Sequence, residues 1–414
     1  MEAQINTRHW VWNFVPVWIA QLVSLLGSLL AQYAIIWWLT IESGSAAVMA
    51  TSTLFGMLPS VLLGPFAGTL VDRFNRKWIM IISDFVIACL VGVLIALFKL
   101  ELVQYWHIYL LMALRSIGGA FHGAALNASI GLMVPEEQLT RVSGINQSLQ
   151  GVMAIVAPPL AAALLAIPAL SFSGLLSIDV FTAAIAIVSI AMIVVPQPPR
   201  KEIALNIGNF LTETREGFSY VWRWKGLRYL LFFLMMFGFF FMPLNALESL
   251  FVLQHLKQDM IAFSVIETSF GIGFMLGGIL LGVWGGFKKK VNTVLLGMSG
   301  VAISLVIHAL TPIEYWWIAA ASMGLCGLLL PILNGPVYAI LQSVVDVSIQ
   351  GRVFALQNSV NSGASVLALV LVGVLAEGLN VQQILLYSGI GVCIIVIWAV
   401  LSPSLQVIEK NRQV

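Results

Sequence analysis

Apolar stretches long enough to cross a lipid bilayer follow one another along almost the whole chain. A membrane-spanning helix needs about 20 mostly apolar residues. Only 9% of the 414 residues are Asp, Glu, Lys or Arg, whereas about 25% is typical of soluble domains. These charges are too few to cover a water-soluble globule, so lipid must solvate most of the surface. Backbone groups in lipid are satisfied only within helices or closed barrels. Because the apolar runs are continuous and not alternating, the sequence predicts an all-α integral membrane protein.

Twelve stretches meet the length requirement, and one long interruption at 196–227 divides them into two sets of six. The interruption contains Pro-Gln-Pro-Pro-Arg-Lys and then an amphipathic stretch, 210–224, which is expected to lie as a helix on the membrane surface. The predicted domains are an N-terminal six-helix bundle (1–195), a cytoplasmic linker (196–227) and a C-terminal six-helix bundle (228–414). The predicted spans are 12–39, 47–70, 78–98, 105–128, 144–166, 172–195, 228–253, 262–284, 292–310, 315–341, 353–376 and 382–402.

Lysine and arginine are distributed unequally between the two sides of the predicted membrane. If both termini are cytoplasmic, the opposite side keeps only Lys99 and Lys257 of the 20 basic residues, and Arg115 lies within a span. An excess of basic residues in short loops marks the cytoplasmic side. An odd number of spans would break this asymmetry, so the sequence predicts cytoplasmic termini. The net charge of +2 gives no indication of nucleic-acid binding.

The two halves contain an internal repeat. Arg141-Val142-x3-Asn146-Gln147-Ser148-x-Gln150 in the fifth span aligns with Arg352-Val353-x3-Gln357-Asn358-Ser359-x-Asn361 in the eleventh. Both segments lie at the same side of the membrane, as in parallel repeats, which predicts a central cavity between two similar bundles. Amide side chains avoid lipid. They are expected either at this cavity and the seam between the halves, or between neighbouring helices of one bundle.

The loop after the second span is similar to a family signature. Gly68-Thr-Leu-Val-Asp72-Arg73-Phe-Asn75-Arg76-Lys77 resembles the pattern Gly-x-Leu-Ala-Asp-Arg-x-Gly-Arg-Lys of the major facilitator superfamily. Asn75 replaces the usual glycine, and Asn also tolerates the left-handed backbone. The resemblance implies the major facilitator fold of two pseudo-symmetric six-helix bundles. It also implies that Asp72, Arg73, Arg76 and Lys77 form a latch that fastens one conformational state.

Further motifs are similar to drug/proton antiporters of that superfamily. Arg115-Ser-Ile-Gly118-Gly119 matches the Arg-x-x-x-Gly pattern of the fourth span, and Gly151-x5-Ala157-Pro158-x2-Ala161 resembles an antiporter motif with alanine at two glycine positions. The segments 114–122, 134–140 and 242–247 resemble bacterial macrolide-efflux proteins. This resemblance implies a monomeric proton-coupled exporter of macrolides in the bacterial inner membrane. Its partners would be a hydrophobic small molecule, protons and membrane lipid, without a cofactor, a metal or nucleic acid.

Acidic residues within the predicted spans are the candidates for proton coupling. A desolvated acid holds a proton more tightly, and a neighbouring cation reverses this effect as the protein changes shape. Asp84, Asp179 and Glu248 are the expected carriers, with Arg115 as the cation that needs a partner. In the alternative interpretation, Asp84 and Asp179 are structural partners of Arg115 or of the basic loop. Glu267, near the outer end of its span, is expected to be solvated.

Polar and aromatic residues of the spans are candidates for the substrate cavity. In the superfamily, the first, fourth, seventh and tenth spans line this cavity. His122 lies on the same helix face as Arg115, which suits either a proton relay or hydrogen-bonded packing. Aromatic residues of the seventh span offer a soft apolar surface for bulky ligands. The predicted cavity residues are Gln21, Ser24, Gln32, His122, Asn127, Asn146, Gln150, Phe237, Phe241, Asn245, Asn334, Gln357 and Asn361.

Two alternatives to macrolide export remain open. Related branches of the superfamily export siderophores or move lysophospholipids. A membrane-bound lipid-modifying enzyme would need histidine, acidic or metal-binding groups converging at one interface, but the five histidines are scattered along the chain. Cys89, Cys326 and Cys393 lie inside apolar runs without a metal-binding spacing, so neither a disulfide framework nor a zinc site is expected.

Overall fold

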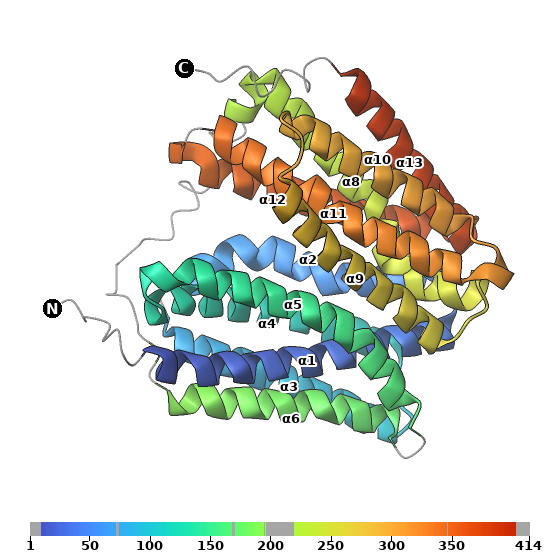
Figure 1. Ribbon diagram of the computed structural model, residues 1–414. Helices are drawn as coiled ribbons and strands as arrows, with labels where there is room; N and C mark the ends of the chain where they lie inside the picture. The colour runs from blue at the N-terminus through green and yellow to red at the C-terminus, as the bar shows by residue number, and fades with distance from the viewer. Residues whose placement is uncertain are drawn as a thin grey trace. The chain divides into compact units, whose positions relative to one another are not determined.

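The computed structural model describes residues 10–71, 74–167, 170–193, 195, 219–345 and 347–402. Within these ranges the chain is almost entirely helical and has no strand, so the all-α prediction is confirmed (Figure 1). Two short helical segments lie between consecutive long helices: the π-helix η1 (Phe251–His255) and the 3-10 helix η2 (Ile313–Tyr315). The long helices are α1 (Trp10–Ser43), α2 (Ala46–Val71), α3 (Arg76–Lys99), α4 (Tyr105–Met133), α5 (Glu136–Leu165), α6 (Phe172–Met192), α8 (Lys225–Leu250), α9 (Met260–Trp284), α10 (Lys290–Ala309), α11 (Trp317–Val344), α12 (Val347–Leu375) and α13 (Val381–Leu401).

Each predicted span corresponds to one of these long helices. Among the described residues, ten helices are long and apolar enough to cross a membrane. The other two predicted spans are α4, which carries Arg115, and α5, which begins with the polar segment 136–141 and has a shorter apolar part, Gly151–Leu165. Most of the predicted surface helix at 210–224 lies outside the described residues, and 219–223 is helical.

The chain divides into two compact units. Unit 1 comprises Met1–Leu39 and Thr51–Leu205, and unit 2 comprises Thr40–Ala50 and Asn206–Val414. The short segment at 40–50 belongs to unit 2 because Thr40 donates a hydrogen bond to Ser249 Oγ (2.7 Å) and Gln254 donates to the Gly44 carbonyl. In unit 1, α3 packs against both α4 and α6. In unit 2, α11 packs against α9 and α10, and α8 packs against α12 and α13. The three-segment division at 195 and 227 stays a prediction.

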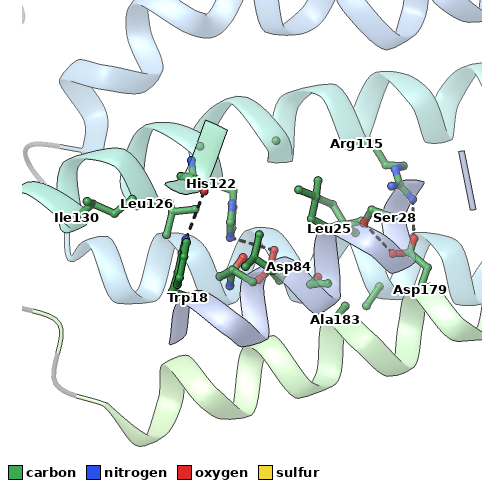
Figure 2. Close-up of a pocket in the computed structure, with 18 residues that line it drawn as sticks. Trp18, Leu25, Ser28, Asp84, Arg115, His122, Leu126, Ile130, Asp179 and Ala183 are labelled. Atoms are coloured by element: carbon green, nitrogen blue, oxygen red, sulfur yellow. Dashed lines mark hydrogen bonds and ion pairs between the residues drawn. The ribbon is translucent and has the colours of Figure 1, made fainter. Parts of the chain in front are cut away.

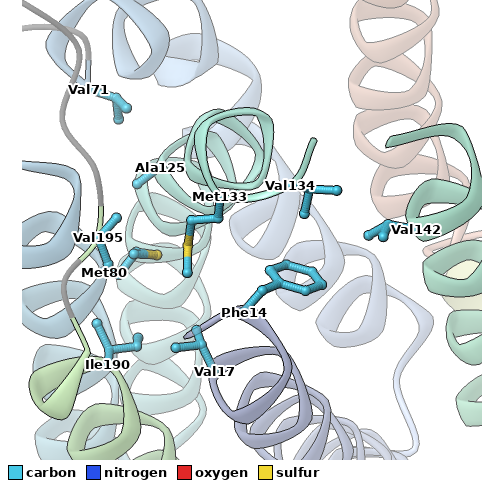
Figure 3. Packing of buried hydrophobic residues seen from close by; sticks show 10 residues of the cluster. All are labelled: Phe14, Val17, Val71, Met80, Ala125, Met133, Val134, Val142, Ile190 and Val195. Carbon is cyan, nitrogen blue, oxygen red and sulfur yellow. The ribbon is translucent and has the colours of Figure 1, made fainter. Parts of the chain in front are cut away.

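A buried apolar cluster joins the helices of unit 1 (Figure 3). Phe14 and Val17 of α1 pack with Met80 of α3 and Met133 of α4, all of them almost fully buried. Side chains from α2, α5 and α6 complete the cluster, namely Val71, Val142 and Ile190. Burying apolar side chains in this way removes them from both lipid and water and fixes the helix positions by close packing.

Glycines bring the backbones of unit 2 into direct contact. A Cβ atom at Gly273 would collide with the Gly324 carbonyl oxygen, and one at Gly277 would collide with the Leu328 carbonyl oxygen. A Cβ at Gly327 would collide in the same way with the Phe270 carbonyl oxygen of α9. Small residues allow such close approach in membranes, where packing, not hydrophobicity, holds helices together.

The described part of the predicted latch holds helix ends within unit 1. Arg76 is buried and donates a hydrogen bond from Nη1 to the Ala128 carbonyl of α4 (2.8 Å). Lys77 Nζ donates to the carbonyls of Ala191 and Ile193, at 2.7 and 2.8 Å, at the end of α6. A cation at a helix C-terminus is favourable because the unpaired carbonyls carry partial negative charge. Asp72 and Arg73 lie outside the described residues.

Asn75 does not adopt the left-handed backbone that its replacement of the usual glycine suggested. Its φ is −67° and its ψ is 113°, which is extended backbone and not left-handed. Its side chain accepts a hydrogen bond from the Lys77 backbone N–H (3.0 Å) and so caps the N-terminus of α3. Asn is among the preferred capping residues because its side-chain oxygen satisfies a free N–H of the first turn.

Candidate functional site

A cavity of about 370 Å³ lies inside unit 1 (Figure 2). Five helices line it: α1, α3, α4, α5 and α6. The α1 residues Trp18, Gln21, Leu25 and Ser28 follow the three- and four-residue spacing of one helix face, which is why they point to the same space. The lining combines apolar side chains with four titratable groups: Asp84, Arg115, His122 and Asp179.

Arg115 and Asp179 form an ion pair at one end of this cavity. Arg115 Nη1 of α4 lies 2.7 Å from Asp179 Oδ2 of α6. Ser28 Oγ of α1 donates to the other carboxylate oxygen, Oδ1, at 2.8 Å. The side chain of Asp179 is 3% exposed and that of Arg115 is 17% exposed. Side chains of two helices, α4 and α1, thus satisfy both oxygens of one buried carboxylate on α6, as a buried charge requires.

Asp84 is held less firmly. Its Oδ1 lies 3.4 Å from His122 Nε2, and its buried Oδ2 has no hydrogen-bond partner among the described residues. The side chain of Asp84 is 11% exposed and that of His122 is 15% exposed, and both line the cavity. A largely buried carboxylate with a free oxygen is favoured by a nearby cation.

The formal charges of the groups that line the cavity do not balance. Two carboxylates, Asp84 and Asp179, face one guanidinium, Arg115, and the imidazole of His122 lies beside Asp84. Because Arg115 is already paired with Asp179, the excess formal negative charge belongs to Asp84. The cavity thus presents one carboxylate that has no arginine or lysine partner among the lining residues.

Other predicted cavity residues of unit 1 have different positions. Gln21, Ser24 and Asn146 line the cavity, and Asn146 Oδ1 accepts a hydrogen bond from the indole N–H of Trp18 (3.3 Å). Gln32 is exposed and is not among the lining residues. The side chains of Asn127 and Gln150 lie outside the described residues.

The remaining predicted cavity residues belong to unit 2. Phe237 and Phe241 of α8 stack with ring centroids 5.6 Å apart. Asn245 and Asn334 are exposed. Gln357 and Asn361 of α12 are buried and half-buried, and their amide oxygens have no hydrogen-bond partner among the described residues.

Glu248 is buried in unit 2 beside a residue that sequence reasoning did not select. Its Oε2 lies 3.0 Å from Nε2 of His308, on α10. The sequence could have suggested this pairing, because both residues lie in the last turn of an apolar helix.

Two residues that line the cavity of unit 1, Ser28 and Trp18, were also not predicted from the sequence, although both share a helix face with Gln21. The other intramembrane acid, Glu267, lies on α9.

The chain is similar to known transporters over most of its length. The profile of the Major Facilitator Superfamily matches residues 17–369. Macrolide efflux protein A of Streptococcus pyogenes is 36% identical over 404 residues, covering 97% of this chain and 98% of that protein. Macrolide efflux protein A of Enterococcus faecalis is 37% identical over 320 residues, covering 77% of this chain and 98% of that protein.

Solved structures of transporters share the fold. The nucleoside transporter NupG aligns with a TM-score of 0.72 and 12% identity, covering 94% of this chain and 98% of NupG. A bacterial homologue of the iron transporter ferroportin, in its inward-facing state, aligns with a TM-score of 0.71 and 14% identity, covering 92% and 95% of the two chains. At such low identity these structures support the arrangement of helices alone.

Proposed function

This chain belongs to the major facilitator superfamily, and on that premise we propose that it exports amphiphilic drugs, with macrolide antibiotics as the substrate class. The observation that carries the proposal is the 36% identity to Macrolide efflux protein A across 97% of the chain. The protein would act as a monomer in the bacterial inner membrane, with both termini cytoplasmic. Alternating access between two conformations would release the drug outside.

Proton antiport is the proposed driving force, and the cavity of unit 1 suggests how it operates. Macrolides with an amino sugar carry a protonated amine at neutral pH. The excess negative charge at Asp84 would attract either this amine or a proton, but not both. A proton entering from outside would therefore displace the drug, and loss of the proton inside would restore the binding charge. Arg115 and Asp179 would keep their own charges balanced throughout and confine the exchange to Asp84 and His122.

The size of the cavity limits which part of a macrolide it can hold. Its 370 Å³ lies near the lower end of the range of about 300 to 1,000 Å³ for small-molecule sites. We propose that the amino sugar enters the cavity and that the macrolactone ring remains outside it. Aromatic side chains such as Trp18 would pack against the sugar, while Gln21 and Asn146 would accept or donate its hydrogen bonds.

The test is accumulation of radiolabelled erythromycin in a pump-deficient bacterium that expresses this chain. We expect low accumulation that rises when a protonophore removes the proton gradient. The same cells are tested with a labelled lysophospholipid and a ferric siderophore, which represent the alternative substrates. Unchanged erythromycin accumulation with and without the chain would reject macrolides, and depletion of one of the other compounds would replace them as the substrate class.

A further inference from the structure

Unit 2 contains a buried acid–imidazole pair that is separate from the cavity of unit 1. Glu248 Oε2 of α8 and His308 Nε2 of α10 are 3.0 Å apart, with side chains 4% and 1% exposed. The aromatic ring of Phe251, the first residue of η1, lies 4.8 Å from the imidazole of His308 between ring centroids. Pi-helical turns inside helices occur frequently at functional sites.

Both nitrogens of the His308 imidazole lie beside a polar group. Nδ1 lies 3.2 Å from Ser322 Oγ of α11. Ser322 Oγ also donates a hydrogen bond to the Ala319 carbonyl at 2.8 Å. While its hydroxyl proton is used in that bond, Ser322 can only accept from Nδ1–H. A neutral imidazole carries hydrogen on only one nitrogen, so in this tautomer Nε2 presents a lone pair to Glu248.

In that tautomer, a lone pair and an ionised carboxylate 3.0 Å apart would repel each other in a deeply buried site. One additional proton removes the conflict, either as a carboxylic acid facing a neutral imidazole or as a carboxylate facing an imidazolium. In both forms the pair is neutral as a whole. Without the proton it would leave one uncompensated negative charge buried in the membrane, which costs several kcal/mol.

Among the described residues, the helices packed against the pair bring no further charge to its level. The remaining charged residues of α8, α10 and α12 are Lys225, Arg228, Lys290 and Arg352, each in the first two turns of its helix, whereas Glu248 and His308 are in the last turns. α11 and α13 contain no charged residue. Glu42, on the segment whose Thr40 bonds to Ser249, is exposed. Two other titratable side chains belong to the surroundings: Cys326 of α11, which interacts electrostatically with Glu248, and His255 of η1, whose Nε2 donates to the Thr311 carbonyl (2.9 Å).

We infer that Glu248 and His308 together form a second proton-binding site, which holds one proton as a pair and releases it only when unit 2 admits water. The binding of this proton follows from the geometry alone. Its release during export rests on the proposed function, because only alternating access would expose the pair. The chain would then carry one proton in unit 2 in addition to the one exchanged at Asp84.

The presence of the proton is tested by nuclear magnetic resonance on the full chain in lipid nanodiscs, with 15N-labelled histidine, from pH 6 to 8.5. The His308 signals are assigned by their loss in His308→Gln. We expect one of two results: an imidazolium beside an ionised carboxylate, or a neutral Nδ1–H form whose Nε2 accepts a hydrogen bond from a protonated carboxyl. In the second case the infrared band of that carboxyl disappears in Glu248→Gln. A neutral His308 protonated at Nε2 beside an ionised Glu248 would overturn the inference. If His308→Gln does not fold, the other four histidines are substituted one at a time, and the signal that none of these variants loses belongs to His308.

The release of the proton is tested in proteoliposomes. Glu248→Gln supplies a neutral amide in place of the acid, so drug movement down its own gradient is expected to continue. Uptake driven by an imposed pH gradient should fall about tenfold, a typical size for coupling between two sites. Glu377→Gln, an exposed acid beyond α12, is the matched control and should behave as wild type. Full retention of gradient-driven uptake in Glu248→Gln would show that the proton is not exchanged. If no drug moves in any variant, the proposed function fails, whereas the spectroscopic result still stands.

Discussion

At the scale of single residues, the two aspartates of the cavity are expected to respond differently to neutralisation. On the proposed mechanism, Asp84→Asn removes the group for which a proton and an amine compete. The purified variant should bind labelled erythromycin more weakly than wild type in equilibrium dialysis, because the amine loses its counter-charge, and export in cells should be lost. Glu377→Gln serves again as the exposed control. Wild-type binding and export by Asp84→Asn would assign the exchange to another group.

Neutralisation of Asp179 is expected to lower the stability of the protein. Asp179→Asn leaves Arg115 without its counter-charge in a largely buried position, and breaking such a pair costs about 3 kcal/mol or more. Ser28→Ala removes only one hydrogen bond to the carboxylate, for which about 1.5 kcal/mol is expected. Unfolding in a denaturing detergent, followed by circular dichroism, measures both changes. The double variant Asp179→Asn with Arg115→Gln should recover part of the loss, and a double variant less stable than Asp179→Asn alone would argue against this pairing.

The buried charged residues were partly predictable from the sequence, but their contacts were not. A charged side chain inside a span must face protein or water, which selected Asp84, Arg115, Asp179 and Glu248. The sequence contains no information on which helices become neighbours, so the Arg115–Asp179 and Glu248–His308 pairs needed the structure. Ser28 was missed because a serine in an apolar helix more often bonds to its own backbone.

At the scale of elements, the glycines between α9 and α11 give a matched pair of substitutions. Gly277→Ala would place a methyl group against the Leu328 backbone, which cannot rotate away, whereas a Cβ at the adjacent Gly278 meets nothing within 4 Å. We expect Gly277→Ala to lower the stability of the protein by about 1 to 3 kcal/mol, the range for overpacking. Gly278→Ala should match wild type or exceed it slightly. The fraction that remains monodisperse after heating in detergent distinguishes them, and equal loss in both variants would contradict this packing.

Helix ends were less predictable than helix centres. The fifth span was expected at 144–166, but α5 begins at Glu136, and α12 begins at Val347, ahead of the expected 353. Hydropathy marks only the part of a helix that lies in hydrocarbon, while a polar first turn continues the same helix into the interface. The start of α3 is marked more clearly, because Asn75 is a preferred capping residue and stands immediately before the helix.

At the scale of the whole molecule, the distribution of basic residues predicts the orientation in the membrane. Alkaline phosphatase, which is active only outside the cytoplasm, can be fused after Lys99, after Lys257 and within the linker at 196–227. We expect activity from the first two fusions and none from the third, because positive loops remain in the cytoplasm. An active linker fusion would reverse the orientation and place the proposed latch on the outer side.

The helical class and the number of spans followed from the sequence because each lipid-facing helix must be apolar by itself. The grouping of 40–50 with unit 2 did not, because it depends on hydrogen bonds between distant segments, such as that from Thr40 to Ser249. The internal repeat predicts two similar bundles, but single side chains have diverged. Unit 1 holds its charges in a cavity, whereas unit 2 holds Glu248 and His308 in a packed interior.

The backbone contacts of Gly273, Gly277 and Gly327 have a consequence for how such a transporter can evolve. Positions where main chain touches main chain accept no larger residue, so random mutagenesis should return almost no functional changes in the α9–α11 seam. The cavity wall differs, because side chains such as Leu25 and Leu126 border open volume, so a change in their size alters the cavity before it moves a helix. Under selection for resistance to new antibiotics, adaptive mutations are therefore expected to accumulate in that wall while the glycine seam stays unchanged.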